Sequence, residues 1–124
     1  MCRTKLTPIR CMLRVSLGRD NAFWGPGVTE LLHDINECQS LRASAQNMKI
    51  SYSKAWKIIH NAEQQLGFSL VESTTGGASG GGSKLTDQAI RLLAAYDNMM
   101  EEIRQLQEVL FVKYFKDVLL ERRK

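Results

Sequence analysis

The sequence predicts a mainly α-helical fold with a small β component: a winged helix-turn-helix followed by one long helix. Three features of its 124 residues predict this fold. Two short helical patterns are separated by a brief turn, a glycine-rich hairpin pattern follows them, and an apolar helical pattern continues from residue 87 to the end. We therefore expect a winged helix-turn-helix over residues 1–86 and a long dimerisation helix over residues 87–124.

Residues 40–67 contain the predicted helix-turn-helix. Ser40 and Ser51 are residue types that cap helix N-termini, and Gly67 is a typical C-terminal stop. The second helix, over about residues 51–66, has an apolar stripe and an opposite polar face. Its stripe consists of Ala55, Ile59, Ala62 and Leu66. This longer helix is the predicted recognition helix.

Charge is distributed unevenly along the chain. The net charge is +4, and all of the excess lies in residues 1–86, which contain ten basic and six acidic residues. From Ser40 to His60 every charged residue is basic. These residues are Arg42, Lys49, Lys54 and Lys57. A face of one sign suggests an anionic partner, and DNA is the obvious one. An ordinary helical hairpin with a solvated lysine face is an equal alternative from this stretch alone.

The predicted wing covers about residues 70–86. Strand-like residues flank the run GGASGGG, whose glycines allow the main chain to approach a ligand closely. The candidates for contacts to the DNA backbone are Thr74, Thr75, Ser79 and Lys84. A nucleotide-binding P-loop is excluded, because the order Gly82-Ser83-Lys84 reverses the required lysine and serine.

Direct contacts to DNA are expected from the start of the second helix, which is the part that usually approaches base edges. The groove-facing candidates are Tyr52, Ser53 and Lys57. The phosphate-binding candidates are Arg42 and Lys54, together with the helix N-termini at Ser40 and Ser51. We expect Trp56 to be partly buried, where it would brace the two helices.

Before residue 40 the pattern predicts two strands and a helix. Residues 9–17 alternate between apolar and polar side chains, which indicates a half-buried strand, and residues 22–24 can return as a second strand. The sequence GPG then leads into a helical stripe from Val28 to about Cys38. Cys11 and Cys38 lie on apolar patterns and are expected in the core. Three cysteines without a CxxC pair indicate reduced thiols in the cytoplasm.

The last predicted helix runs from Asp87 to about Arg122, with Thr86 as its cap. Its apolar side exceeds what a small domain would cover, so we expect it to pack against the same helix of a second chain. Folding back onto its own core is the alternative. The expected interface residues are Leu92, Tyr96, Met99, Met100, Ile103, Leu106, Leu110 and Tyr114.

Four stretches together resemble a known family. The sequences FWGPGVTELLHDI, ISYSKAW, LGFSLVES and GGASGGGSKLT are similar to the N-terminal DNA-binding domain of ModE-type molybdate-responsive transcription regulators. A weaker resemblance extends to LysR-type winged helix-turn-helix domains. The resemblance covers most of the chain from about Arg10. The full-length regulators carry C-terminal molybdate-binding domains, and this chain ends before them, so we expect no molybdate binding.

The sequence thus predicts a DNA-binding transcription regulator that acts as a homodimer on an inverted-repeat site. A winged-helix module that binds proteins and not DNA is the alternative. No arrangement of nucleophile and base, paired carboxylates or metal ligands stands out, so we expect no enzyme activity, cofactor or metal. No apolar run reaches the length of a membrane span.

Overall fold

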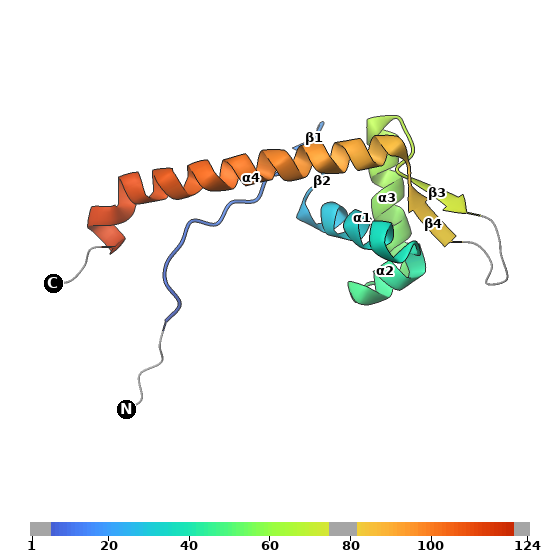
Figure 1. Ribbon diagram of the computed structural model, residues 1–124, viewed down its shortest axis with the longest axis horizontal. Coiled ribbons are helices and arrows are strands. Elements are labelled where there is room, and N and C mark those ends of the chain that lie inside the picture. Colours follow the sequence, from blue (N-terminus) through green and yellow to red (C-terminus); the bar gives the residue numbers. More distant parts are fainter. Residues whose placement is uncertain (1–5, 75–81, 121–124) are drawn as a thin grey trace, which may run out of the picture. The chain divides into compact units, whose positions relative to one another are not determined.

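The computed structural model describes residues 6–74 and 82–120 (Figure 1). Its contacts divide the chain into two compact units, Arg14–Asp97 and the combination of Met1–Leu13 with Asn98–Lys124. The predicted division at residue 86 does not coincide with these units. The reason is that the last helix begins at Asp87 and buries Ala89 and Leu93 in the first unit. The mainly helical architecture with small antiparallel sheets is as predicted.

The strand predicted over residues 9–17 is wrong. Residues 6–16 have no regular secondary structure. Only β1 (Leu17–Gly18) forms, and it pairs antiparallel with β2 (Ala22–Trp24), which confirms the predicted return strand. The register shifts between Leu17 and Gly18. No other described strand pairs with this segment, so residues 9–16 have no neighbouring strand with which to form hydrogen bonds.

Helix α1 (Pro26–Cys38) confirms the helix predicted after GPG. Pro26 lies in the first turn, where backbone N–H groups have no intrahelical acceptor. The absence of an N–H group in proline therefore costs this helix no hydrogen bond. The buried apolar residues of this helix are Val28, Leu31, Leu32 and Ile35. They pack in a core that also contains the fully buried Trp24 and Leu70.

Both cysteines expected in the core are exposed, so that prediction is wrong. Cys38 is the last residue of α1, where the chain turns away through Gln39 in a left-handed conformation with φ 56°. Cys11 lies in the irregular segment before β1. An apolar position in the sequence is buried only if another element covers it.

The helix-turn-helix consists of α2 (Leu41–Asn47) and α3 (Tyr52–Leu66), and both predicted caps are confirmed. The Ser40 hydroxyl accepts the Ala43 N–H, and the Ser51 hydroxyl accepts the Lys54 N–H, each at 3.0 Å. Gly67 ends α3 with φ 85°, the left-handed conformation that favours glycine.

Small residues allow α2 and α3 to approach each other. Ala45 and Ala55 are almost completely buried, and a larger side chain at either position would overpack the interior. In the turn between the helices, Lys49 adopts the left-handed conformation with φ 60°. This turn fixes the direction in which α3 leaves α2.

The wing is an antiparallel hairpin of β3 (Val71–Thr74) and β4 (Gly82–Leu85), as predicted. Its register runs from Val71 opposite Leu85 to Thr74 opposite Gly82. The Ser83 N–H donates to the Gln39 carbonyl at 3.0 Å, which attaches β4 to the end of α1. The candidates Thr75 and Ser79 lie outside the described residues.

Helix α4 spans Asp87–Phe115 and continues as a π-helix over Lys116–Leu120. The predicted start and cap are confirmed, because the Thr86 hydroxyl accepts the Ala89 N–H at 3.1 Å and donates to the Ser69 carbonyl at 2.7 Å. The α-helical geometry ends at Phe115, earlier than predicted. Within the described residues, none of the helices has the length and apolar character required to cross a membrane.

Candidate nucleic-acid interface

The first half of α3 presents its polar side chains to solvent. Ala55 and Ile59 point into the core, so residues on the opposite side of the helix face outward. All four predicted contact residues of this helix are exposed, namely Tyr52, Ser53, Lys54 and Lys57. Their common surface carries positive charge and hydrogen-bonding groups, which are the two properties that a DNA-reading helix needs.

Arg42 of α2 extends toward the start of α3. Its guanidinium carbon lies 4.5 Å from the centroid of the Tyr52 ring, in a cation–π contact. This contact joins α2 to the start of α3, which is the part of α3 predicted to contact DNA. It also holds the Arg42 charge beside the exposed Tyr52 ring.

A polar hollow of about 420 Å³ lies where the helix-turn-helix meets the wing. It is lined by Ser40, Leu41, Arg42, Tyr52, Ser73, Thr74, Gly82 and Ser83. Four of the predicted contact residues therefore share one site, although they come from three separate parts of the sequence. Thr74 has a structural contact here, because its hydroxyl accepts the Gly82 N–H at 2.9 Å.

Ser40 and Ser51 have structural contacts as well, because each hydroxyl already accepts the cap hydrogen bond of its own helix. Lys84 lies apart from the polar hollow. In the ladder it stands opposite the exposed Glu72, whereas Ser83, its neighbour in the strand, lines the hollow. Side chains alternate between the faces of a strand, so Lys84 points away from the hollow.

The basic side chains of this region keep their charge unpaired. Within residues 6–74 and 82–120, no ion pair involves Arg42, Lys54, Lys57 or Lys84. A cation without an internal partner can pair with phosphate and release counterions, which is the main source of salt-dependent affinity for DNA.

Trp56 was expected to brace the helices, but it exposes 45% of its surface. Its indole ring stacks on His60, with the ring centroids 3.9 Å apart and the planes inclined by 20°. Sequence reasoning missed both residues as candidates. Their spacing of four residues along the exposed side of α3 is the signal that could have found them.

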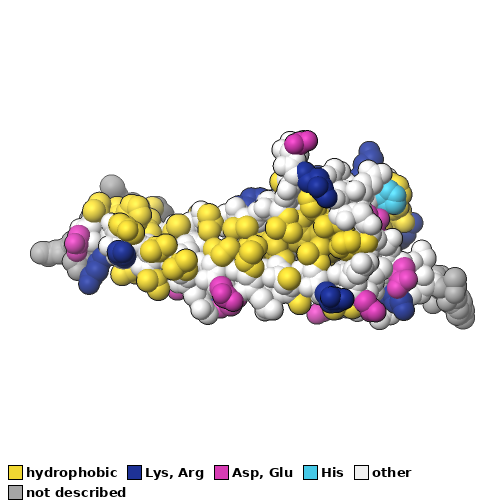
Figure 2. All heavy atoms as spheres, turned by 90° about the horizontal axis from the view of Figure 1, so that it is seen from above, with side chains coloured by type: hydrophobic (Ala, Val, Ile, Leu, Met, Phe, Trp, Pro, Cys, Tyr) yellow, Lys and Arg dark blue, Asp and Glu magenta, His cyan; other side chains and the backbone are white. Residues whose placement is uncertain are grey.

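The predicted interface residues of α4 separate into two groups. Tyr96 is 5% exposed and lies in the core of its own unit, where its hydroxyl donates to the Val15 carbonyl at 2.7 Å and its ring meets Trp24 edge-on. Leu92, Met100 and Ile103 are half-buried. The exposed members are Met99, Leu106, Leu110 and Tyr114. Figure 2 shows hydrophobic side chains along most of the face seen from above, including the part over the C-terminal half of α4 at left.

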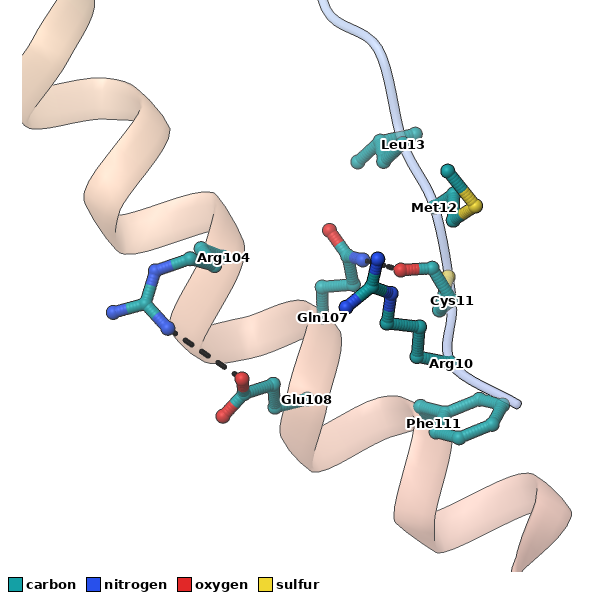
Figure 3. A pocket seen from close by; sticks show the side chains of 8 residues that line it. All are labelled: Arg10, Cys11, Met12, Leu13, Arg104, Gln107, Glu108 and Phe111. Carbon is teal, nitrogen blue, oxygen red and sulfur yellow. Dashed lines mark hydrogen bonds and ion pairs between the residues drawn. The ribbon is translucent and has the colours of Figure 1, made fainter. Parts of the chain in front are cut away.

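The unit that combines residues 6–13 with the C-terminal half of α4 contains an apolar groove of about 580 Å³. Its lining includes four predicted interface residues, namely Ile103, Leu106, Leu110 and Tyr114. Figure 3 shows an adjoining pocket, where Phe111 and Gln107 of α4 face the segment around Cys11.

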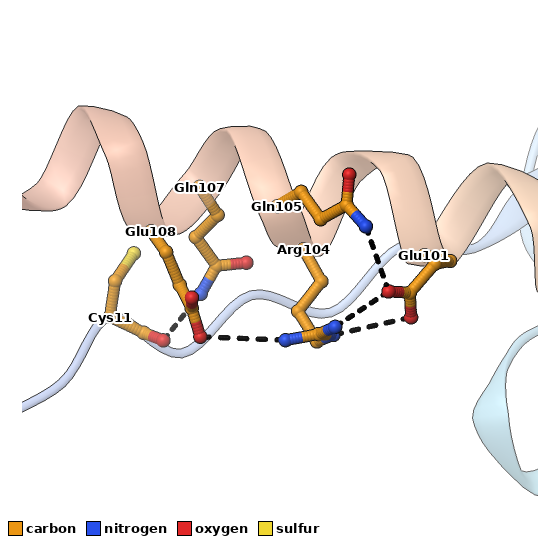
Figure 4. A network of polar contacts seen from close by, with 6 residues as sticks. All are labelled: Cys11, Glu101, Arg104, Gln105, Gln107 and Glu108. Atoms are coloured by element: carbon orange, nitrogen blue, oxygen red, sulfur yellow. Dashed lines mark hydrogen bonds and ion pairs between the residues drawn. The ribbon is translucent and has the colours of Figure 1, made fainter.

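A polar network borders this pocket (Figure 4). The Gln107 amide donates to the Cys11 carbonyl oxygen, and Arg104 pairs with Glu101 at 2.6 Å and with Glu108 at 3.4 Å. The hydrogen bond from Arg104 lowers the pKa of Glu101 below its ordinary value. These ions are exposed, so the network orients side chains and adds little stability.

The chain is similar in sequence to several known proteins. Residues 29–90, from α1 into α4, match the family described as bacterial regulatory helix-turn-helix protein, lysR family. The chain is 40% identical over 75 residues to the transcriptional regulator ModE of Haemophilus influenzae. The aligned segment covers 60% of this chain and 29% of that protein.

Two further relatives match over more of this chain. The DNA-binding transcriptional dual regulator ModE of Escherichia coli is 37% identical over 67% of this chain and 31% of its own length. The molybdenum-pterin-binding protein MopB of Rhodobacter capsulatus is 34% identical over 70% of this chain and 32% of its own length. The chain thus spans about a third of the length of these curated relatives.

Proposed function

This chain belongs to the bacterial regulatory helix-turn-helix proteins of the lysR family, and on this basis we propose that it binds double-stranded DNA and regulates transcription. The observation that carries the proposal is the exposed first half of α3, whose charged residues are all basic and which lies beside the polar hollow and the wing. A helix of this kind enters the major groove with its N-terminal residues toward the bases.

The placement of the side chains supports a proposal for the individual contacts. Tyr52, Ser53 and Lys57 are exposed on α3 and would reach base edges. Arg42 and Lys54 have unpaired charges and would bind phosphates on either side of the groove. The hollow between α2, α3 and the wing would receive the sugar-phosphate backbone, with Thr74 at its edge and Lys84 on the outer face of the wing.

We further propose that the regulator acts as a homodimer. The apolar surface of α4 around Leu106, Leu110 and Tyr114 is exposed within one chain, and burial of apolar surface is the main favourable term in association. A two-fold dimer presents two copies of α3, so its site would be an inverted repeat. Tyr96 is already covered by its own unit and is left out of this interface.

Selection of binding sites from random duplex DNA tests the proposal. The wild-type chain is compared with Lys57→Ala and with Arg91→Ala, which removes an equal charge from an exposed position of α4. We expect the wild type and Arg91→Ala to enrich an inverted repeat that Lys57→Ala loses. On the selected site, Lys54→Ala, which removes a proposed phosphate contact, should reduce the slope of log affinity against log salt by about 0.9.

Other outcomes separate the alternatives. Retention of DNA without an enriched motif would indicate an architectural protein that binds the backbone only. Absence of binding at low salt, with dimerisation intact, would favour the protein-interaction module. The name of one of these relatives, the molybdenum-pterin-binding protein MopB, refers to molybdenum. We predict that this chain does not bind molybdate, and calorimetry with molybdate would test that prediction.

A further inference from the structure

Three aromatic side chains form a column along α3. Tyr52, Trp56 and His60 follow one another at intervals of four residues, so they lie on neighbouring turns of one side of the helix. All three residues are exposed, with Tyr52 at 42% and Trp56 at 45% of full exposure. Large aromatic rings on an otherwise polar helix surface are typical of a contact site.

Polar partners hold the two ends of the column. At the start of α3, the Arg42 guanidinium lies over the Tyr52 ring. Further along, His60 stacks on Trp56, and its Nδ1 lies 3.3 Å from Glu63 Oε1. The other carboxylate oxygen of Glu63 accepts the Leu70 N–H at 2.8 Å, at the base of the wing.

These contacts orient the indole ring before any ligand arrives. Trp56 exposes much of its surface. The His60 imidazole covers one face of the indole ring and so restricts rotation of the Trp56 side chain. A side chain that is already ordered loses little conformational entropy on binding. An indole surface held in this way suits an apolar group at a defined position better than a phosphate.

The edges of the bases in the major groove carry one apolar group, the C5-methyl of thymine. We propose that the aromatic column reads thymine methyl groups, with Trp56 as the principal contact. The inference rests on the proposed DNA binding. It adds to that proposal a specific feature of the bases, the thymine methyl group, and a contact residue, Trp56, that was predicted to have only a packing role. Lys57 and Ser53 would supply the polar contacts to neighbouring base edges.

Replacement of thymine by deoxyuridine tests the inference, because it removes the methyl group and keeps the hydrogen-bonding pattern. Each thymine of the selected site is replaced in turn, and affinity is measured for the full chain, for Trp56→Ala and for Gln64→Ala. Gln64 is an exposed residue of α3 outside the column and serves as the control. Thermal melts establish that the variants fold, which we expect because Trp56 is outside the core.

For the wild type and Gln64→Ala, we expect at least one thymine per half-site whose replacement weakens binding about fourfold, the effect of removing one methyl-sized apolar contact. For Trp56→Ala, the same replacement should change the affinity less than twofold. An equal methyl effect in all three proteins would overturn the inference. So would a selected site that shows no methyl effect, even though the chain binds it with the expected salt dependence. A wild-type chain that binds no DNA would overturn the proposed function as well.

Discussion

The Glu63 carboxylate accepts a hydrogen bond from the Leu70 backbone N–H at 2.8 Å, and this bond connects the end of α3 to the base of the wing. The same oxygen lies 3.3 Å from the Val71 N–H. Both N–H groups are partly buried. If the carboxylate were removed, water would not fully replace it as their hydrogen-bond acceptor. The wing is therefore held in place by a side chain of α3.

Replacement of Glu63 by alanine should lower the free energy of unfolding by about 1–3 kcal/mol, because two backbone donors lose their acceptor. Urea denaturation would measure the change. Glu30→Ala removes an exposed carboxylate of α1 and should stay within about 0.5 kcal/mol of the wild type. Equal stability of the two variants would show that the wing does not depend on Glu63.

Gly82 permits close contact between β4 and the end of α1. A Cβ atom at this position would lie 2.7 Å from the Gln39 carbonyl oxygen, which is closer than real side chains approach backbone. Gly82→Ala should therefore displace the wing, lower stability by about 1–3 kcal/mol and weaken binding to the selected DNA. Thermal denaturation and titration with DNA would measure both effects.

Gly27→Ala is the matched control for that substitution. Nothing lies within 4 Å of a Cβ at Gly27, and this glycine is in the first turn of α1. Alanine is a better helix former, so the control should be neutral or more stable by up to about 1 kcal/mol. A Gly82→Ala protein as stable as this control would contradict the close contact.

Tyr96 should make stability depend on alkaline pH. Burial raises the pKa of its phenol above the ordinary value, and the nearby Arg14 charge opposes this shift only in part. Because the folded state then ionises at a higher pH than the unfolded chain, the contribution of Tyr96 is complete below about pH 10 and is lost as the pH rises further.

Tyr96→Phe separates that contribution from other effects. At neutral pH the variant should lose about 1 kcal/mol, because the Val15 carbonyl loses its donor. Above about pH 10 its stability should fall less steeply than that of the wild type. Denaturation curves at several pH values would test this, and parallel losses in both proteins would rule out Tyr96 as the cause.

Substitution of Leu106 tests the proposed dimer. This residue is 58% exposed within one chain, so Leu106→Glu should not unfold the domain. In a dimer it would place two charges in an apolar interface. We therefore expect the dissociation constant of the dimer to rise at least about tenfold. Sedimentation velocity would measure the monomer fraction. Glu102→Gln changes an exposed residue of the same helix and should leave the dimer intact; a Leu106→Glu protein that remains dimeric would exclude this surface.

The features that the sequence by itself determined are those with local causes. Ser40 and Ser51 cap their helices, and Gly67 ends α3, because each effect involves only the nearest turn of backbone. The wing hairpin and the stripe of α1 also follow from short-range patterns. These elements placed the predicted contacts of α3 on an exposed surface.

The tertiary structure decided what each apolar residue meets. Tyr96 and Trp56 both stand on helices at the edge of an apolar stripe, yet Tyr96 is covered by its own unit and Trp56 faces solvent. The alternating pattern around Ile9 and Leu13 forms no strand, because a strand needs a partner and no described strand pairs with it. Periodicity shows which side chains share a face of an element, but burial depends on which other elements cover that face.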